Sequence, residues 1–182
     1  MINDPDLGLI VRILEGEQHL YAQLVNKHKS YAYSLALRVL ENKSEAEEAA
    51  QDAFVKAFKY LAGFNRDAKF STWLYRIVFN TAISYKRKQK VKMQSIDNVH
   101  IGYHQDALEK NDKKRFIEEA IAKLNEADRV AITLFYLQEF SLEEIADITN
   151  TPANTVKVRI HRARHRLAEE LKGILHQEAL SL

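Results

Sequence analysis

The chain has 182 residues, of which 46% are hydrophobic and 29% charged, with only 5 Gly and 2 Pro. This composition is typical of a soluble helical protein, and the length suits two small domains better than one. The sequence contains no Cys, which excludes a disulfide framework, thiol catalysis and cysteine-bound zinc.

The distribution of charge is more informative than the net charge of +2. Acidic residues are concentrated between positions 41 and 52, whereas residues 86–92 and 153–166 contain bases and no acid. One acidic and two basic segments predict one protein partner and two contacts with a polyanion. The N-terminus lacks the basic start and apolar core of a signal peptide, and no later run approaches membrane-spanning length, so we expect a cytoplasmic protein.

Residues 17–61 are predicted to form a helical hairpin. The first helix, from about 17 to 40, is expected to turn Leu20, Leu24, Tyr31 and Leu35 inward. Ser44 and Glu47 match a capping box that would start the second helix. The inward stripe of that helix comprises Ala46, Ala50, Ala53, Phe54, Ala57 and Leu61.

The opposite face of the second helix carries an apolar residue among charges. It comprises Glu48, Asp52, Val55 and Lys59, flanked by Gln51. A protein-binding surface has this character, although a single exposed valine is also common on any helix.

A third helix is predicted from near Phe70, and both of its faces contain apolar residues. The inward side comprises Phe70, Leu74, Ile77, Val78, Thr81 and Tyr85. The other side comprises Thr72, Arg76, Phe79, Asn80, Ile83 and Arg87, and leads into the basic segment 86–90. Cations attract phosphates and apolar groups hold unstacked bases, so this side fits single-stranded DNA. Packing of Phe79 and Ile83 against a neighbouring helix would explain the pattern equally well.

Residues 90–111 show no sustained apolar period and are predicted to be a linker. Helices at about 113–124 and 126–137 then lead to a second capping box, Ser141 with Glu144, which opens a short helix that ends near Thr149. Asn150 tolerates a left-handed turn, and Thr151 is expected to cap a new helix with Pro152 at its first position. This order predicts a helix-turn-helix.

The last helix is predicted to be the recognition helix. Its core stripe comprises Val156, Ile160, Ala163 and Leu167. Its outward arc comprises Val158, His161, Arg162 and His165, edged by Thr155 and Arg159, with Lys157 and Arg164 on the remaining flank. The N-terminal half of such a helix enters the major groove of DNA. A basic helix that only coats the surface is disfavoured, because the cap, turn, proline and basic face all occur at the right offsets.

Four segments together resemble the extracytoplasmic-function group of the sigma-70 family over nearly the whole chain. They are residues 47–58, 70–82, 124–129 with 140–146, and 154–164. The Phe-Ser-Thr-Trp-Leu-Tyr-Arg-Ile run at 70–77 is the most specific of these. The resemblance implies an all-α fold of two small helical domains: a region 2 domain at 1–89, a linker at 90–111, and a region 4 helix-turn-helix domain at 112–182.

The resemblance also implies a function and a set of contacts. The chain would be an alternative sigma factor, without catalysis, cofactor or metal, that binds core RNA polymerase and promoter DNA, with an anti-sigma factor as a further candidate partner. Core polymerase contacts are implied at Glu48, Gln51, Asp52, Val55, Lys56 and Lys59. Minus-ten contacts are implied at Lys69, Ser71, Thr72, Trp73, Arg76, Phe79, Asn80, Ile83, Ser84 and Arg87. Minus-thirty-five contacts are implied at Asn154, Thr155, Lys157, Val158, Arg159, His161, Arg162, His165 and Arg166.

Two further points qualify the expected DNA contacts. The loop 63–69 and the start of the following helix would help to hold an everted base. Ser84 stands where many family members carry an acid, so the promoter sequence is not transferable from the family.

The sequence pattern argues against three other functions. A stand-alone helix-turn-helix regulator would carry a receiver domain, and residues 1–90 show no strand ladder. A helical adaptor that binds only protein does not need two acid-free basic segments. An enzyme is disfavoured because the sequence has neither a paired-histidine zinc motif nor a glycine-rich phosphate loop.

Overall fold

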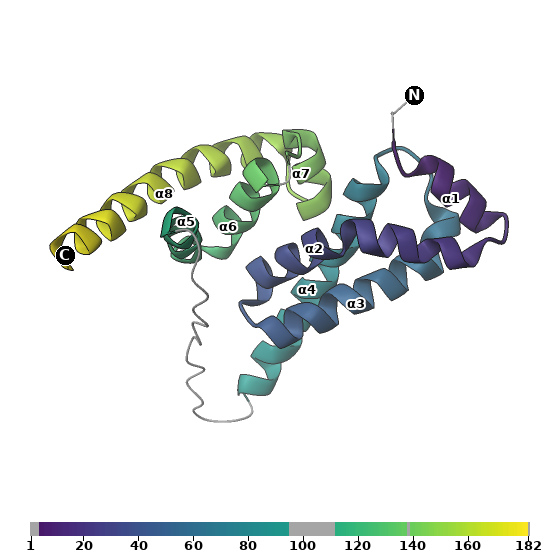
Figure 1. Cartoon of the computed structure of the whole chain (residues 1–182), viewed down its shortest axis with the longest axis horizontal. Coiled ribbons are helices and arrows are strands. Elements are labelled where there is room, and N and C mark those ends of the chain that lie inside the picture. Colours follow the sequence, from purple (N-terminus) through teal and green to yellow (C-terminus); the bar gives the residue numbers. More distant parts are fainter. Residues whose placement is uncertain (1–3, 95–111, 138, 182) are drawn as a thin grey trace.

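The computed structural model describes residues 4–94, 112–137 and 139–181, and within these ranges it contains helices and no strand (Figure 1). The N-terminal domain consists of α1 (Leu7–Leu14), the 3-10 turn η1 (Gln18–Leu20), α2 (Tyr21–Leu40), α3 (Lys43–Tyr60), the 3-10 turn η2 (Leu61–Gly63) and α4 (Phe70–Gln94). The C-terminal domain consists of α5 (Asp112–Ala122), α6 (Glu126–Ile132), the π-helical turn η3 (Thr133–Leu137), α7 (Leu142–Thr149) and α8 (Ala153–Ser181). The prediction of an all-α fold of two helical domains is confirmed.

The predicted linker begins within α4, because that helix continues to Gln94. The rest of the predicted linker, residues 95–111, lies outside the described residues. In the part of the chain that the structure describes, no helix is both long and apolar enough to span a membrane.

Small side chains bring the three long helices of the N-terminal domain together. The inward stripe of α3 is buried as predicted, and Ala49 joins it. Alanines at a helix contact let neighbouring backbones approach closely, so α2 and α4 pack on either side of this stripe. The core between the helices is then filled by larger side chains, among them Leu24, Phe70 and Leu74, which are fully buried.

Two local predictions in this domain are wrong. The cap of α3 is Asn42, whose Oδ1 accepts from the Glu45 amide at 3.1 Å, so Ser44 already lies inside the helix. Tyr31 is 48% exposed, because the buried stripe of α2 runs through His28, Ala32 and Leu35 and leaves Tyr31 to one side. The sequence pattern missed this stripe because a histidine occupies one of its positions.

The helix-turn-helix forms largely as its sequence predicts. Ser141 and Glu144 make the reciprocal hydrogen bonds of a capping box at the start of α7. Asn150 adopts the left-handed conformation, with φ 49° and ψ 48°, and reverses the chain into α8. The predicted cap at Thr151 is wrong: α8 begins at Ala153, and the Thr151 hydroxyl donates to the Thr149 carbonyl at 3.2 Å.

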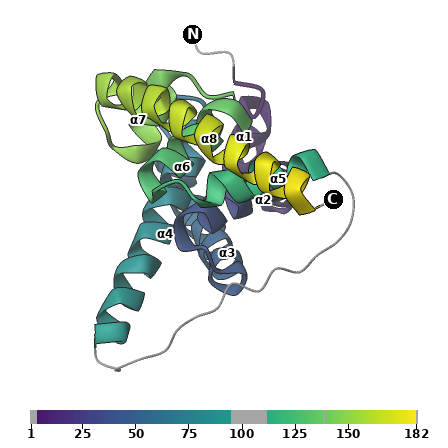
Figure 2. The ribbon, with the colours of Figure 1, turned by 90° about the vertical axis from the view of Figure 1, so that its left-hand side faces the viewer.

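The two domains lie against each other (Figures 1 and 2). Helix α7 packs on α4, and α6 contacts α2. The buried apolar core continues across this junction, where the rings of Tyr75 and Phe140 have centroids 5.6 Å apart.

Candidate functional surfaces

The outer face of α3 presents the residues predicted to bind core polymerase. Glu48, Gln51, Asp52, Val55, Lys56 and Lys59 are all exposed, and Val55 exposes 54% of its surface. Two of these side chains also tie α3 to α4: Asp52 accepts from the Tyr85 hydroxyl at 2.7 Å, and Lys56 donates to the Thr81 hydroxyl at 3.1 Å. The bond to Asp52 raises the pKa of Tyr85 to about 12, helped by burial. Neutral Tyr85 therefore remains the donor.

An apolar groove adjoins this face, and sequence reasoning missed it. It lies between the start of α2 and the second half of α3, has a volume of about 730 Å³, and is lined by Tyr21, Val25, Phe54, Val55 and Phe58, among others. The Tyr21 hydroxyl donates to the Phe54 carbonyl at 2.7 Å, which fixes one wall. Only pairing α2 with α3 creates the groove, so no single helical period could have predicted it.

The N-terminal segment holds the start of α4 in place. Asp4 accepts from the Phe70 amide at 2.7 Å, so a residue from the other end of the domain caps this helix. Asp6, which is 4% exposed, accepts from Nε2 of His28 at 2.8 Å and from Lys27. The sequence analysis did not predict these contacts, because the partners of Asp4 and Asp6 lie 66 and 22 residues away along the chain.

The buried His28 continues this chain of hydrogen bonds to α4. Its Nδ1 lies 3.0 Å from the Tyr75 hydroxyl, and burial raises the pKa of Tyr75 above its usual value. Burial alone would raise the pKa of Asp6, but the hydrogen bonds from His28 and Lys27 outweigh it and lower that pKa. A charged carboxylate is therefore retained in the core, where it holds His28 of α2, and His28 in turn contacts Tyr75 of α4.

The residues predicted to meet the minus-ten DNA are unequally accessible on α4. Four of them are exposed along the helix, namely Arg76, Asn80, Ser84 and Arg87, and Lys69 is exposed just before its start. Four are half-buried, namely Ser71, Trp73, Phe79 and Ile83. The Ser84 hydroxyl donates to the Asn80 carbonyl at 2.8 Å. The cations therefore lie along the exposed side of one helix, whereas Phe79 and Ile83 pack partly against the buried core, as the alternative interpretation of the pattern expects.

Thr72 is the exception, because the C-terminal domain covers it. It is only 2% exposed, and its hydroxyl donates to Glu144 on α7 at 3.4 Å. Lys69 pairs with the same carboxylate, with Nζ and Oε1 2.9 Å apart. Burial raises the pKa of Glu144, but bonds from the Ser141 amide, Lys69 and Thr72 outweigh it and lower that pKa.

Helix α8, the predicted recognition helix, exposes most of its predicted DNA-binding side chains. Asn154, Thr155, Lys157, Val158, His161, Arg162 and His165 are exposed, and Arg159 is half-buried. Val156, Ile160 and Ala163 are buried on the other side, as predicted, and anchor the helix to its domain. Arg166 differs from the rest, because its guanidinium lies 2.6 Å from the buried carboxylate of Asp128 on α6.

Two family models match the chain in the order of its domains. The model for Sigma-70 region 2 matches residues 24–91, and that for Sigma-70, region 4 matches residues 116–167. Among curated relatives, the ECF RNA polymerase sigma factor SigW of Bacillus subtilis is 36% identical over 179 residues, covering 91% of this chain and 96% of the relative. The ECF RNA polymerase sigma-E factor of Escherichia coli K12 is 30% identical over 186 residues, covering 94% of this chain and 97% of the relative.

Solved structures agree with these matches. The sigma factor RpoE, in complex with the anti-sigma factor NepR from Bartonella quintana, superposes with a TM-score of 0.73 at 29% identity, covering 84% of this chain and 96% of that one. The structure of CnrH in complex with the cytosolic domain of CnrY has a TM-score of 0.68 at 24% identity, covering 93% of this chain and 99% of that one. This likeness shows the same fold. The chain therefore belongs to the extracytoplasmic-function group of the sigma-70 family and is an alternative sigma factor of transcription initiation.

Proposed function

We propose that three separate surfaces of this sigma factor bind three different targets during transcription initiation. The outer face of α3 binds core RNA polymerase, α4 binds the minus-ten strand, and α8 reads the minus-thirty-five duplex. The proposal rests on one observation: the acidic and apolar face of α3 and the basic face of α8 are both exposed and lie on different domains. Two targets can therefore be held at once, and each raises the effective concentration of the other.

The chemistry of each surface fits its proposed target. On α3, exposed Val55 surrounded by carboxylates offers an apolar anchor with a charged rim, which is the usual anatomy of a protein interface. On α4, Arg76 and Arg87 can neutralise phosphates while Phe79 and Ile83 present apolar surface to unstacked bases. We propose no reaction for the chain itself, because binding alone accounts for these surfaces.

On α8, we expect Arg162 to read a base and Arg164 to contribute only charge. Arg162→Ala should weaken binding of the minus-thirty-five duplex by about 1–3 kcal/mol if its guanidinium makes a bidentate contact. Arg164→Ala removes the same charge from the flank of the helix, so it should cost less and mainly reduce the salt dependence. Fluorescence anisotropy across a salt series measures both effects, and equal losses for the two variants would contradict base reading by Arg162.

The proposed partners follow from these surfaces and from the relatives. Core polymerase and promoter DNA meet in the cytoplasm, where we place the protein. We also propose an anti-sigma factor as a regulator, because the structure of a 29%-identical sigma factor contains one.

Transcription from a promoter library tests the function directly. Core polymerase supplemented with this chain should initiate at a discrete set of promoters, whereas core enzyme alone should not. The recovered start sites then define the minus-ten and minus-thirty-five elements. If the chain failed to restore specific initiation, the sigma-factor function would be wrong, and a stand-alone regulator or an adaptor would become the better explanation.

A further inference from the structure

We propose that Asp4 is a positioning residue for the minus-ten surface. By capping α4 from a distant part of the chain, it holds loop 64–69, between η2 and α4, in the conformation that receives an everted base of the promoter strand. The inference rests on the proposed DNA-binding role of α4 and of the loop before it. It goes beyond that role because Asp4 belongs to neither element and acts on DNA only through them.

The loop before α4 does not cap this helix itself. The first turn of α4 closes with a hydrogen bond from the Trp73 amide to the Lys69 carbonyl at 3.1 Å. Asp67 is the only acid in the loop, and its carboxylate accepts from the Asn65 side chain instead. Within loop 64–69, all of which the structure describes, no side chain is seen to accept from an amide of α4. The start of α4 therefore depends on an acceptor from elsewhere in the chain.

Asp4 supplies this acceptor with one carboxylate oxygen and is itself held through the other. Its Oδ2 accepts from the Phe70 amide at 2.7 Å, and its Oδ1 accepts from the Asp6 amide at 2.9 Å. The Leu7 amide also donates to the Asp4 carbonyl at 3.2 Å, so Asp4 belongs to the turn that opens α1. A carboxylate at a helix N-terminus satisfies a free amide and interacts favourably with the helix dipole. The two bonds together fix the orientation of the Asp4 side chain.

The turn that carries Asp4 is anchored in the core of the domain. Asp6, two residues later, is 4% exposed and accepts from Nε2 of His28 at 2.8 Å. Nδ1 of His28 lies 3.0 Å from the hydroxyl of Tyr75 on α4. The same short segment therefore holds α4 at two points within its first two turns, directly through Asp4 and indirectly through Asp6.

The inner side of loop 64–69 is fixed by an aromatic cluster. Phe64 is 7% exposed, and the centroid of its ring lies 5.8 Å from that of Phe70 and 5.4 Å from that of Trp73. The ring of His28 also packs on Phe70, with centroids 5.6 Å apart. Phe70 is thus the residue at which the cap, the loop and the buried histidine meet. A shift of the Phe70 backbone would displace Phe64 and Trp73 as well, because their rings are in contact.

The outer side of the loop is open to a ligand. Asn65, Arg66 and Asp67 are exposed, and Trp73, in contact with the loop, is half-buried. These groups offer hydrogen bonds to the edge of a base and part of an aromatic ring for stacking. Arg66 has a left-handed backbone with a φ of 65°, a conformation that a residue with a side chain keeps only where the surrounding structure imposes it. The open side of the loop therefore depends on the anchors at its two ends, of which Asp4 is one.

Loss of the cap should loosen the loop without unfolding the domain. Removal of a helix cap lowers the equilibrium constant for folding by about 2- to 30-fold, which a packed domain tolerates. The affinity of the loop for a base falls in proportion to the fraction of chains in which the loop has the right conformation. We therefore expect Asp4 to affect the recognition of one base of the strand more than any other contact of the chain.

A thermodynamic cycle between the chain and the DNA tests this coupling. The full chain is assembled with core RNA polymerase, and fluorescence anisotropy measures binding of a single-stranded oligonucleotide that carries the minus-ten element of a promoter recovered from the library. Each base of the element is then replaced in turn by an abasic site. For the wild type, an abasic site at the everted position should weaken binding by about 5- to 100-fold, the range for loss of one stacked base.

Three substitutions of Asp4 separate its hydrogen bond from its charge. Asp4→Ala removes the cap. Asp4→Asn is the conservative variant, because asparagine caps helices as well as aspartate does and its amide oxygen can accept from the Phe70 amide. Asp4→Glu keeps the charge but displaces the acceptor by one methylene, so it is a milder disruption that should act in the same direction as Asp4→Ala.

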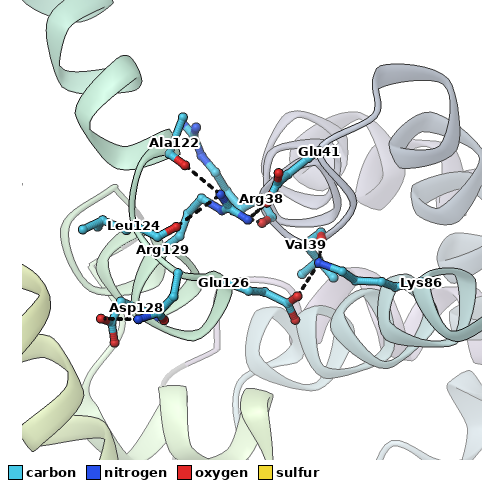
Figure 3. A network of polar contacts seen from close by, with 10 residues as sticks. Arg38, Val39, Glu41, Lys86, Ala122, Leu124, Glu126, Asp128 and Arg129 are labelled. Carbon is cyan, nitrogen blue, oxygen red and sulfur yellow. Dashed lines mark hydrogen bonds and ion pairs between the residues drawn. The ribbon is translucent and has the colours of Figure 1, made fainter. Parts of the chain in front are cut away.

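Glu126→Ala is the matched control. Glu126 of α6 is a second acid that reaches α4 from another part of the chain, because it pairs with Lys86 in the second half of the helix (Figure 3). Lys86 keeps its hydrogen bond to the Val39 carbonyl, at 2.9 Å, when this acid is removed. Urea unfolding followed by the fluorescence of Trp73, the only tryptophan, confirms that each variant is folded.

We expect Asp4→Ala to bind the intact oligonucleotide about 5- to 30-fold more weakly than the wild type does. At one position, the abasic site should then weaken its binding by no more than about threefold, because the loop no longer holds that base. Asp4→Glu should show a smaller loss at the same position. Asp4→Asn should stay within about threefold of the wild type on every oligonucleotide. Glu126→Ala should show the wild-type effect of each abasic site, and all variants should bind core polymerase within about twofold of the wild type.

Equal weakening of Asp4→Ala and Asp4→Glu on every oligonucleotide, intact or abasic, would overturn the inference and leave Asp4 as a stabilising cap only. Wild-type sensitivity to every abasic site in both variants would overturn it as well. If no abasic site weakened binding by the wild type, the inference would fall together with the proposed DNA role of α4 and its loop. The wild-type chain thus tests the proposed function, and the Asp4 variants test the positioning role.

Discussion

Replacing Val55 with aspartate is expected to weaken binding of the chain to core RNA polymerase by about 10- to 100-fold, or about 1.4–2.8 kcal/mol. Val55 is the apolar centre of the exposed α3 face and borders the groove between α2 and α3. A carboxylate that is buried without a partner at the middle of an interface weakens binding by more than the loss of the Val55 contact alone would. Because the side chain is exposed in the free chain, the substitution should leave folding intact.

A matched control is available on the other domain. Leu175 on α8 is 52% exposed, close to the 54% of Val55, and lies outside the proposed surfaces. Leu175→Asp introduces the same charge and should leave core affinity within about twofold. Competition with a labelled wild-type chain for core enzyme measures both variants. Equal affinities for Val55→Asp and wild type would remove α3 from the core-binding assignment.

Asp6→Ala is expected to destabilise the N-terminal domain by about 2–4 kcal/mol, because it leaves buried His28 without its carboxylate partner. The loss should be seen in urea unfolding followed by the fluorescence of Trp73. That residue packs on Phe64 and Phe70, with ring centroids 5.4 and 5.7 Å apart, and so reports on the start of α4.

The pH dependence of this effect has a definite sign. Asp6 has a pKa below its usual value of about 3.8 in the folded chain, so its ionised form stabilises the fold. That stabilisation is complete above the usual pKa and is lost as the pH falls through the lower folded-state pKa. The stability difference between wild type and Asp6→Asn should therefore narrow below about pH 4.

Asp147→Asn provides the control for this experiment, because Asp147 is exposed on α7 in the other domain. It should change stability by no more than about 0.5 kcal/mol. The proposed role of the ionised carboxylate would be contradicted if the free energies of unfolding of wild type and Asp6→Asn differed by a constant amount down to pH 2.

Most of the long helices and the inward stripe of α3 were predictable because the necessary information is local, whereas α1 and the buried stripe of α2 were not predicted. The Ser141–Glu144 capping box and the left-handed Asn150 each depend on residues within one helical turn. The alanine stripe of α3 was readable from its period alone. The cap at Asn42 was missed because Asn42 and Ser44, two residues apart, can both cap a helix, and the choice depends on how α2 ends, at Glu41 with a φ of 58°.

The sequence by itself determined that this protein is helical, that it carries a helix-turn-helix, and that its charges are concentrated in one acidic and two basic segments. Only the tertiary structure decided which distant side chains meet. Asp4 caps a helix that begins 66 residues later, and Glu144 reaches Thr72 across a domain boundary. Such partners are chosen by the packing of whole helices, and a sequence period of 3.6 residues carries no information about them. For the same reason, the sequence placed Thr72 on an outward face, and the docking of α7 buried it.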